Sequence, residues 1–296
     1  MIDDVSYWVA SHLTGIFEIS DESSNLLYQG SRGAGLSINR GVTTTVRRAK
    51  SSNVEIFFDG MKKTELEAAV TSRVLEILLP DKRQSNLSIF HNFEVPLSSG
   101  YGASAASAVG TAFALNDLLE LNLPELELFQ VAHKAEVLTK TGLGDVIGLY
   151  QGGLEIRLKE GAPGIGQTMS LKSTGEWKVA TAHLGTLSTS EVLSNPQKRK
   201  AVNDAGRELI SELISHPYFH NFIELSTAFT EKANLLTPQL REHIKNLPQG
   251  VIGSQIMLGE SIFIFYRDRS ALADIDIPNA QIIEETICTN TVKKRE

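Results

Sequence analysis

The sequence of 296 residues predicts an α+β fold. Residues 1–95 contain several short runs of Val, Ile, Thr and Phe, a composition typical of strands. Residues 191–247 instead carry apolar side chains at the spacing of helices. Strands and helices do not alternate regularly along the chain, so the pattern does not predict the parallel sheet of an α/β protein.

Composition excludes several classes of protein. The apolar fraction of 42% can fill a sizeable core, and the net charge of −7 argues against a nucleic-acid partner. The single cysteine, Cys288, excludes an internal disulfide and fits a reducing compartment. The N-terminus lacks the features of a signal peptide, and no apolar run is long enough to cross a membrane. We therefore expect a cytoplasmic protein with no membrane partner. The sequence is compatible with a homodimer.

The first half of the chain predicts strands followed by helices. A polar segment, Ser11-His12-Leu13-Thr14, interrupts an otherwise apolar run, and residues 30–35 are rich in glycine. Helical spacing predicts helices over residues 64–79, over the residues that follow the small-residue stretch Pro96–Ser107, and over residues 124–140. β-Branched and apolar runs predict strands at residues 5–10, 15–19, 42–46, 54–58 and 88–95.

The second half predicts a mixture of strands and helices. Helical spacing covers residues 191–247 with short loops between the helices. Strands are expected at residues 154–158, 177–182, 250–257 and 261–266. The change of pattern falls between residues 150 and 185, and we expect one domain over residues 1–165 and a second α+β domain over residues 166–296.

The stretch Pro96–Ser107 consists almost entirely of Gly, Ser and Ala, and it leads directly into a helix. Free N–H groups and the positive end of the helix dipole favour an anion there, and small side chains let a phosphate approach the backbone. The stretch has no lysine, so a nucleotide would depend on the backbone and on hydroxyls, of which Ser104 could also bind Mg²⁺. The alternative is a small-residue helix packed closely against a neighbour, which the sequence leaves open.

Two carboxylates follow this stretch. Glu136 lies late in a predicted helix, and Asp145 follows the glycines 142 and 144. One carboxylate on a metal ion and one beside a hydroxyl group are what phosphoryl transfer requires. The alternative is that Glu136 is a surface residue and Asp145 caps a short helix at residues 146–150.

Four further polar residues are candidates for binding a substrate. His133 lies three residues before Glu136, so both belong to one face of a helix. Arg157 lies on a predicted strand, and its guanidinium suits a carboxylate or a phosphate. Ser31 and His12 complete the set. Taken alone, a residue of this kind is more often a surface or hydrogen-bonded structural residue, so the four gain weight only if the fold brings them to the phosphate stretch.

These motifs resemble the GHMP small-molecule kinases. Residues Pro96–Ala106 are similar to the family pattern PxxxGLGSSAA, and they depart from it at Tyr101 and Ala103. In that family a helix glutamate and then a glycine-rich turn with the catalytic aspartate follow, as Glu136 and Asp145 do here. Residues 250–259 resemble, more weakly, the third glycine-rich motif.

Within that superfamily the chain is most similar to the archaeal pantoate kinases, over residues 5–170 and 248–266. The resemblance implies an N-terminal α+β domain, a C-terminal ferredoxin-like domain, and ATP in the cleft between them. It also implies Mg²⁺ on Ser104 and Glu136, Asp145 at the reacting hydroxyl, and a hydroxy acid, pantoate, held by Ser31, His133, Arg157 and the His12 segment. The nucleotide is expected on Pro96, Ser98, Ser99, Gly100, Gly102, Ala103, Ser104, Ala105 and Ser107.

Three alternatives remain open. A kinase of mevalonate or a mevalonate phosphate would share the fold, and Arg32, Arg40, Arg47 and Arg48 favour a phosphorylated substrate because such a substrate needs a second basic cluster. The changes at Tyr101 and Ala103 motivate a homologue that binds ligand without transferring phosphate. The long helical tract favours, more weakly, a protein-interaction domain.

Overall fold

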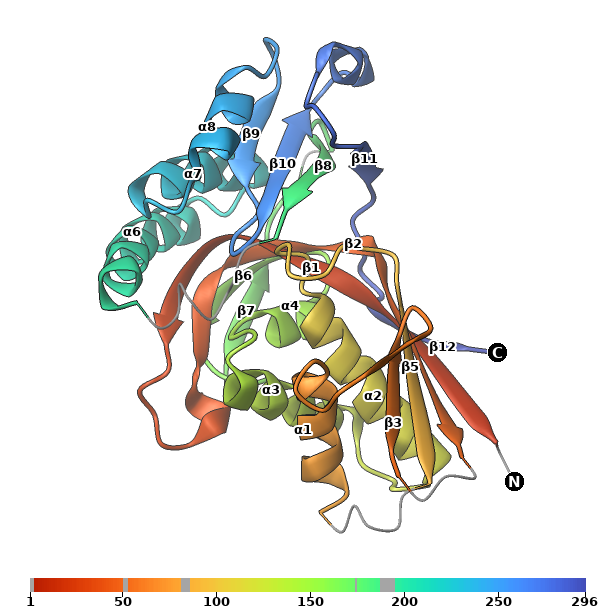
Figure 1. The fold of residues 1–296 in the computed structure, drawn as a ribbon. Coiled ribbons are helices and arrows are strands. Elements are labelled where there is room, and N and C mark those ends of the chain that lie inside the picture. The colour runs from red at the N-terminus through yellow and green to blue at the C-terminus, as the bar shows by residue number, and fades with distance from the viewer. Residues whose placement is uncertain (1–2, 50–52, 81–85, 174, 187–194) are drawn as a thin grey trace.

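The computed structural model contains two antiparallel-rich sheets with helices packed on both (Figure 1). It describes residues 3–49, 53–80, 86–173, 175–186 and 195–296, so residues 191–194 of the predicted helical tract lie outside the described residues. The predicted α+β class is confirmed.

The first sheet is built on a long hairpin of β1 (Asp4–Ser20) and β2 (Gly30–Arg48). Its strand order is β12-β1-β2-β5-β3-β4, and β6 also pairs with β2 and carries β7. The 3-10 turn η1 (Leu26–Tyr28) lies between the two long strands. The remaining strands are β3 (Glu55–Phe58), β4 (Met61–Lys63), β5 (Leu87–Phe93), β6 (Leu154–Lys159), β7 (Gln167–Ser170) and β12 (Val292–Arg295).

The expectation that a polar segment divides the first strand is wrong. β1 continues through residues 11–14, with irregular register at Ala10/Ser11 and at Thr14/Ile16. The strand persists because the fully buried His12 side chain has a carboxylate partner at each ring nitrogen, Asp145 and Glu155, and does not need solvent. The shifts in register at both ends of the segment re-aim the side chains between them.

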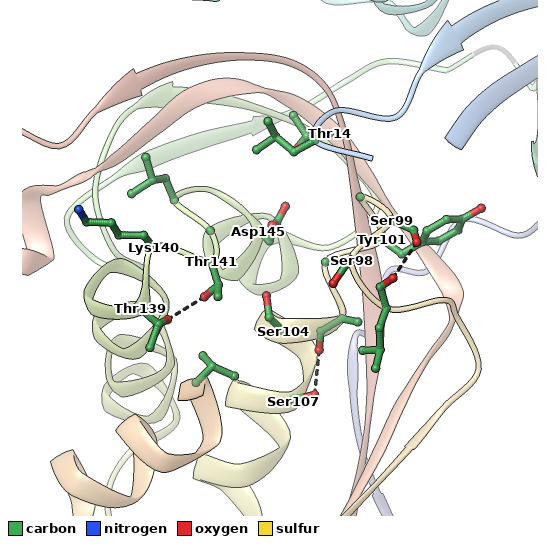
Figure 2. Close-up of a pocket in the computed structure, with 18 of the residues that line it drawn as sticks. Thr14, Ser98, Ser99, Tyr101, Ser104, Ser107, Thr139, Lys140, Thr141 and Asp145 are labelled. Carbon is green, nitrogen blue, oxygen red and sulfur yellow. Dashed lines mark hydrogen bonds between the residues drawn. The ribbon is translucent and has the colours of Figure 1, made fainter. Parts of the chain in front are cut away.

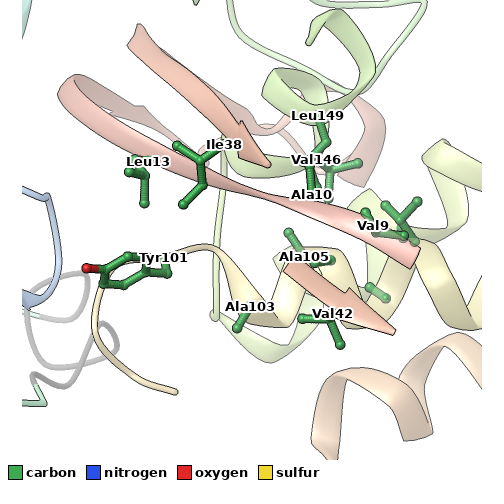
Figure 3. Close-up of a cluster of buried hydrophobic side chains, with 14 of the residues drawn as sticks. Val9, Ala10, Leu13, Ile38, Val42, Tyr101, Ala103, Ala105, Val146 and Leu149 are labelled. Atoms are coloured by element: carbon green, nitrogen blue, oxygen red, sulfur yellow. The ribbon is translucent and has the colours of Figure 1, made fainter. Parts of the chain in front are cut away.

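The concave face of the first sheet holds α1 (Ala69–Leu78), α2 (Ala103–Leu118), α3 (Glu125–Thr139) and α4 (Asp145–Gln151) (Figure 1). Almost all of α2 is buried, and its small residues pack directly on β1 and β2 (Figure 3). A Cβ at Gly110 would lie 2.6 Å from Thr44 Oγ1, which shows how closely helix and sheet approach. The close-packing alternative for the small-residue stretch is therefore confirmed for the body of the helix.

The second sheet has the order β11-β8-β10-β9, and α7 and α8 pack against it, whereas α6 packs against β1 and α7. The predicted strands near residues 180, 254 and 263 are confirmed with shifted bounds. The sequence did not predict four short, polar strands, which are β4, β7, β11 and β12. The bounds are β8 (Lys178–Gly185), β9 (Ile252–Gln255), β10 (Glu260–Tyr266), β11 (Ile282–Glu285), α6 (Pro196–Ser215), α7 (Phe219–Lys232), α8 (Pro238–Lys245) and the 3-10 helix η3 (Arg269–Asp274).

The two sheets share a hydrophobic core. Its buried members include Phe17 of β1 and Phe229 of α7, whose rings lie 5.6 Å apart between centroids. β7 and β12 belong to the first sheet although both lie beyond residue 166. The division of the chain into domains at residue 165 stays a prediction. In the part of the chain that the structure describes, no helix is both long and apolar enough to span a bilayer.

Candidate functional site

A cavity of about 710 Å³ opens where the two sheets meet. Three of the predicted motifs contribute to its wall: the small-residue loop, the turn that ends at Asp145, and the turn after β9 at Met257 and Leu258. Figure 2 shows Ser104, at the start of α2, and Asp145, at the start of α4, on opposite sides of one space with Ser98 beside it. The fold thus brings together segments that are more than a hundred residues apart in the sequence.

The small-residue loop delivers the N-terminus of α2 to this cavity. Gly102 is the N-cap in the left-handed region at φ 62°, and no side chain caps the helix. A Cβ at Gly102 would lie 2.8 Å from the His12 carbonyl oxygen, so only glycine lets the loop approach β1 this closely. The first N–H groups of α2 are consequently free to bind an anion.

The loop's hydroxyls fall into two groups. Ser99 Oγ donates to the Leu97 carbonyl and Ser107 Oγ donates to the Ala103 carbonyl, each at 2.8 Å, so both are used within the protein. Ser98 and Ser104 also line the cavity (Figure 2), and the hydroxyl of Ser104 lies close enough to Glu136 to lower the pKa of that carboxyl against the larger effect of burial. Every residue predicted to bind nucleotide lines the cavity except Ala105, which is buried in the core (Figure 3). Their binding of nucleotide stays a prediction.

Tyr101, one of the two departures from the family pattern, does not alter the wall chemically. Its ring extends away from Ser104 and Asp145 (Figure 2), and in the core it lies near Leu13 and Ile38 (Figure 3). The side chain is 2% exposed, and burial raises the pKa of its phenol to about 12. The ring therefore serves the packing behind the loop.

The third glycine-rich motif supports the back of the same loop. A Cβ at Gly259 would lie 2.0 Å from the Ser99 carbonyl oxygen, so the two backbones touch. Ser261 Oγ donates to that carbonyl at 2.9 Å, and the Met257 N–H donates to the Thr14 carbonyl at 2.9 Å. The second sheet thereby fixes the shape of a loop that belongs to the first.

Glu136 is a buried carboxylate with one oxygen unpaired. Its Oε1 accepts from Thr141 Oγ1 at 2.6 Å, whereas Oε2 has no hydrogen-bond partner among the residues that the structure describes. Burial raises the pKa of this carboxyl to about 7, and the charge of Asp145 adds to the shift. A Cβ at Gly142 would lie 2.3 Å from Glu136 Oε2 and 3.2 Å from Asp145 Oδ2, so the glycine is what permits the two carboxylates to face one space.

This arrangement fits a divalent cation. An unpaired buried carboxylate oxygen beside a second carboxylate is costly unless a positive charge offsets it. Among the described residues there is no cluster of three or more His, Cys, Asp or Glu side chains that could hold a metal ion by itself. Glu136 and Ser104 would therefore hold Mg²⁺ only together with oxygens of a bound phosphate or water.

Asp145 is the first residue of α4, after the N-cap Gly144. Its side chain is 23% exposed, and its Oδ1 accepts from His12 Nδ1 at 2.8 Å. His12 is fully buried and lies behind Asp145, outside the residues that line the cavity. This position does not support the predicted contact between His12 and a substrate.

The other side of the His12 ring meets a second carboxylate. Its Nε2 lies 3.0 Å from Glu155 Oε1, and the same oxygen accepts from Arg157 Nη1 at 2.6 Å. Burial alone would lower the pKa of the imidazole, but the charge of Glu155 and the hydrogen bonds to both carboxylates raise it to about 9. His12 is therefore an imidazolium at neutral pH.

Of the other predicted substrate residues, Ser31 and Arg157 line the cavity and His133 does not. His133 Nε2 donates to the Gln29 carbonyl at 3.0 Å, and burial lowers the pKa of the ring to about 4, so it is neutral. It holds the chain two residues before Ser31. Its role toward a substrate stays a prediction, as do those of Ser31 and Arg157.

Sequence reasoning missed Lys140 and the apolar end of the cavity. Lys140 is the exposed, left-handed C-cap of α3 at φ 55°, and no sequence motif marks it. Among the described lining residues, the cations are Lys140 and Arg157. The apolar end brings together residues from separate predicted elements and from the loop after them, so no local pattern marks it; it is lined by Phe58, Leu66, Phe93, Pro96 and Leu97.

Comparison with known proteins gives concordant matches. Residues 69–153 match the family model for the GHMP kinases N terminal domain. A curated pantoate kinase of Thermococcus kodakarensis is 35% identical over 286 residues, which cover 92% of each chain. A curated pantoate kinase of Methanocaldococcus jannaschii is 32% identical over 252 residues, covering 85% of this chain and 89% of its own. A solved phosphotransferase related to the CoA biosynthesis pathway superposes with a TM-score of 0.88 at 31% identity, covering 99% of this chain and 98% of its own.

Proposed function

The chain belongs to the pantoate kinases of the GHMP superfamily, and we propose that it transfers the γ-phosphoryl group of ATP to pantoate, giving 4-phosphopantoate. It has the predicted GHMP kinase fold, and its relatives identify it as a phosphotransferase with an alcohol acceptor, in coenzyme A biosynthesis. The observation that carries the proposed chemistry is a single cavity lined by a free helix N-terminus, by Asp145 and by Arg157.

The N-terminus of α2 would bind the phosphates of ATP. Its free N–H groups, with Ser98 and Ser104, offer hydrogen bonds where no lysine is present in the loop. The adenine would lie at the apolar end, near Phe58 and Phe93. Mg²⁺ on Ser104 and Glu136 would offset the phosphate charge that develops in the reaction.

Asp145 would act on the acceptor. Its Oδ1 is held by His12, which leaves Oδ2 to accept the proton of the attacking hydroxyl. The hydroxyl oxygen then forms the new bond to the γ-phosphorus, the bond to the bridging oxygen breaks, and ADP leaves. Arg157, which lines the cavity close to Gly144, would bind the carboxylate of the acid.

The charges of the cavity favour an unphosphorylated hydroxy acid over a mevalonate phosphate. The four arginines that motivated that alternative are engaged elsewhere, with Glu18, Glu285, Asp4 and the Leu118 carbonyl as partners of Arg32, Arg40, Arg47 and Arg48. None of them lines the cavity. A second anionic group would therefore have Lys140 as its remaining cationic partner among the described lining residues.

A panel of acceptors tests this proposal. Release of ADP is coupled to a dehydrogenase reaction, with pantoate, mevalonate, mevalonate 5-phosphate and homoserine as acceptors. We expect turnover with pantoate and with none of the others at comparable kcat/KM. Turnover with a mevalonate phosphate but not with pantoate would overturn the substrate, and ATP binding without turnover on any acceptor would support a silent homologue.

We further propose that the enzyme works in the cytoplasm, where its ATP is supplied. A homodimer, and the lack of nucleic-acid or membrane partners, stay predictions from the sequence.

A further inference from the structure

Glu155 is a buried carboxylate that the proposed chemistry does not use. It lies on β6, it is 0% exposed, and it was not among the residues singled out from the sequence. It does not line the cavity, so it cannot touch ATP or the acceptor there. A buried carboxylate costs free energy unless it is paired. Its presence here therefore calls for a reason beyond packing.

The pairing of Glu155 converges on one atom. Its Oε1 lies 3.0 Å from His12 Nε2 and 2.6 Å from Arg157 Nη1, while Oε2 has no hydrogen-bond partner. His12 in turn holds Asp145, and Arg157 Nη2 donates to Thr14 Oγ1 at 3.3 Å. Along these hydrogen bonds the charges alternate from Asp145 through His12 and Glu155 to Arg157. Arg157 Nη1 also lies 3.5 Å from His12 Nε2, so Glu155 Oε1 is the anion that two neighbouring cations share.

The fold is shaped around the middle of this chain of contacts. A Cβ at Gly148 would lie 2.4 Å from His12 Nε2, and a Cβ at Gly35 would lie 2.8 Å from the same atom. Any larger residue at either position would displace the ring from between its two carboxylates. Asp145 of α4 and Glu155 and Arg157 of β6 are the charged groups that face the ring, and β2 presents Gly35 to it.

We propose that Glu155 is a positioning residue that sets the distance between the base, Asp145, and the acid-binding cation, Arg157. Glu155 Oε1 would then position both groups that contact the acceptor. It holds Asp145 at the hydroxyl through His12, and it holds Arg157 at the carboxylate directly. The inference rests on the proposed roles of Asp145 and Arg157. Its consequence is that Glu155 tunes selectivity for an acceptor that carries a hydroxyl and a carboxylate at one fixed separation.

Kinetics of Glu155→Gln provide the first test. The amide keeps the size of the side chain but removes the charge that both His12 and Arg157 share. We expect the KM for pantoate to rise at least about tenfold and kcat to fall by a similar factor, with the KM for ATP changed less than about twofold. Turnover of the neutral amide of pantoate should fall less than that of pantoate, because Arg157 matters less for it.

Glu18→Gln is the matched control. Glu18 is also a carboxylate of the first sheet, on β1, and it also pairs with arginines, Arg32 at 2.9 Å and Arg207 at 3.3 Å. Unlike Arg157 and Asp145, it lies outside the cavity wall. It should leave both KM values and kcat unchanged. Equal effects of the two substitutions would overturn the proposal.

The second test needs no substrate. The ¹⁵N chemical shifts of the His12 ring in the full-length protein report its protonation, and we expect an imidazolium across pH 6–8. In Glu155→Gln the ring should titrate at lower pH, whereas in Glu18→Gln it should not. A neutral His12 at pH 7 in the unsubstituted protein would overturn the proposal, even if Glu155→Gln does not fold. Failure of pantoate in the acceptor panel would instead leave this result intact and overturn the proposed substrate.

Discussion

His12 and Asp145 are joined by a 2.8 Å hydrogen bond although 133 residues separate them in the sequence. The bond occupies one oxygen of Asp145 and directs the other toward the cavity. The same bond, with the contacts to Glu155, raises the pKa of the His12 imidazole to about 9 against the opposing effect of burial.

Replacing Asp145 with Asn should abolish most of the turnover. The amide cannot accept the hydroxyl proton, so kcat should fall by about 10²–10⁴ while the KM for ATP changes little. Steady-state kinetics with pantoate measure both quantities. Asp117→Asn is a suitable control, because Asp117 contacts Tyr7 and Lys294 outside the cavity wall. Near-normal turnover of Asp145→Asn would remove Asp145 from the role of base.

Replacing Glu136 with Gln should separate stability from activity. The raised pKa means that the folded state retains a proton that the unfolded chain loses as pH rises from 4.5 to about 7. Above that range the native protein carries the whole cost of the buried charge, which the amide avoids. Without metal or nucleotide, we expect the variant to be about 1–3 kcal/mol more stable at pH 8 and to have no such advantage at pH 4.5.

Chemical denaturation in EDTA at the two pH values measures this difference. The same variant should lose at least about 100-fold in kcat if Glu136 holds Mg²⁺ as proposed, because the amide would offer the ion no charged oxygen. A variant that is less stable than the native protein at pH 8 would contradict the assignment of Glu136 Oε2 as an uncompensated charge.

Two glycine-to-alanine substitutions should have similar effects on stability and different effects on catalysis. Gly148→Ala would place a Cβ 2.4 Å from the His12 ring, and Gly110→Ala would place one 2.6 Å from Thr44 Oγ1. Overpacking of this kind lowers the free energy of unfolding by about 1–3 kcal/mol, so both variants should have a lower Tm. Only Gly148→Ala should lower kcat, because only it displaces the group that holds Asp145. Thermal unfolding and kinetics on the two proteins decide, and equal losses of kcat would speak against the role of His12.

Acid should destabilise the protein partly through His91. This ring lies between Thr44 Oγ1 at 2.9 Å and Thr71 Oγ1 at 3.0 Å, and burial lowers its pKa to about 3. The unfolded chain takes up a proton below pH 6.5 and the folded one does not, so stability falls as pH falls from 6.5 toward 3. Between pH 6.5 and 5 this amounts to about 2 kcal/mol.

The comparison with His91→Gln isolates that contribution. The variant should be less stable at pH 7, but its free energy of unfolding should fall about 2 kcal/mol less on going to pH 5. His133, which also stays neutral, contributes equally to both proteins. Identical pH slopes in urea denaturation would show that His91 is accessible to protons in the folded state.

The parts of the site that the sequence predicts are those in which neighbours along the chain do the chemistry. The loop before α2 and the turn that ends at Asp145 are local patterns, so their residues and spacing can be recognised from the sequence alone. The structure brings both segments to one cavity.

What could not be predicted depends on contacts between distant strands. A histidine such as His12 is chemically suited to binding a substrate. Its burial, however, follows from the register of β1 against β2 and from the position of α4, which the sequence does not show. Glu155 looks like an ordinary polar residue on an alternating strand, and only the pairing of β6 with β2 turns it inward. The short strands β4 and β12 carry too few apolar side chains to stand out from loops.

The pairing of β1 with β12 has a consequence for biosynthesis. Val9 pairs with Val292, so the strand that carries His12 acquires its outer neighbour only after almost the whole described chain has been made. Until then β1 presents an unpaired edge, the kind of surface on which nascent chains associate wrongly. A chain that ends before residue 292 would therefore contain the whole loop Pro96–Ser107 but leave the edge of β1 at Val9 without its neighbouring strand.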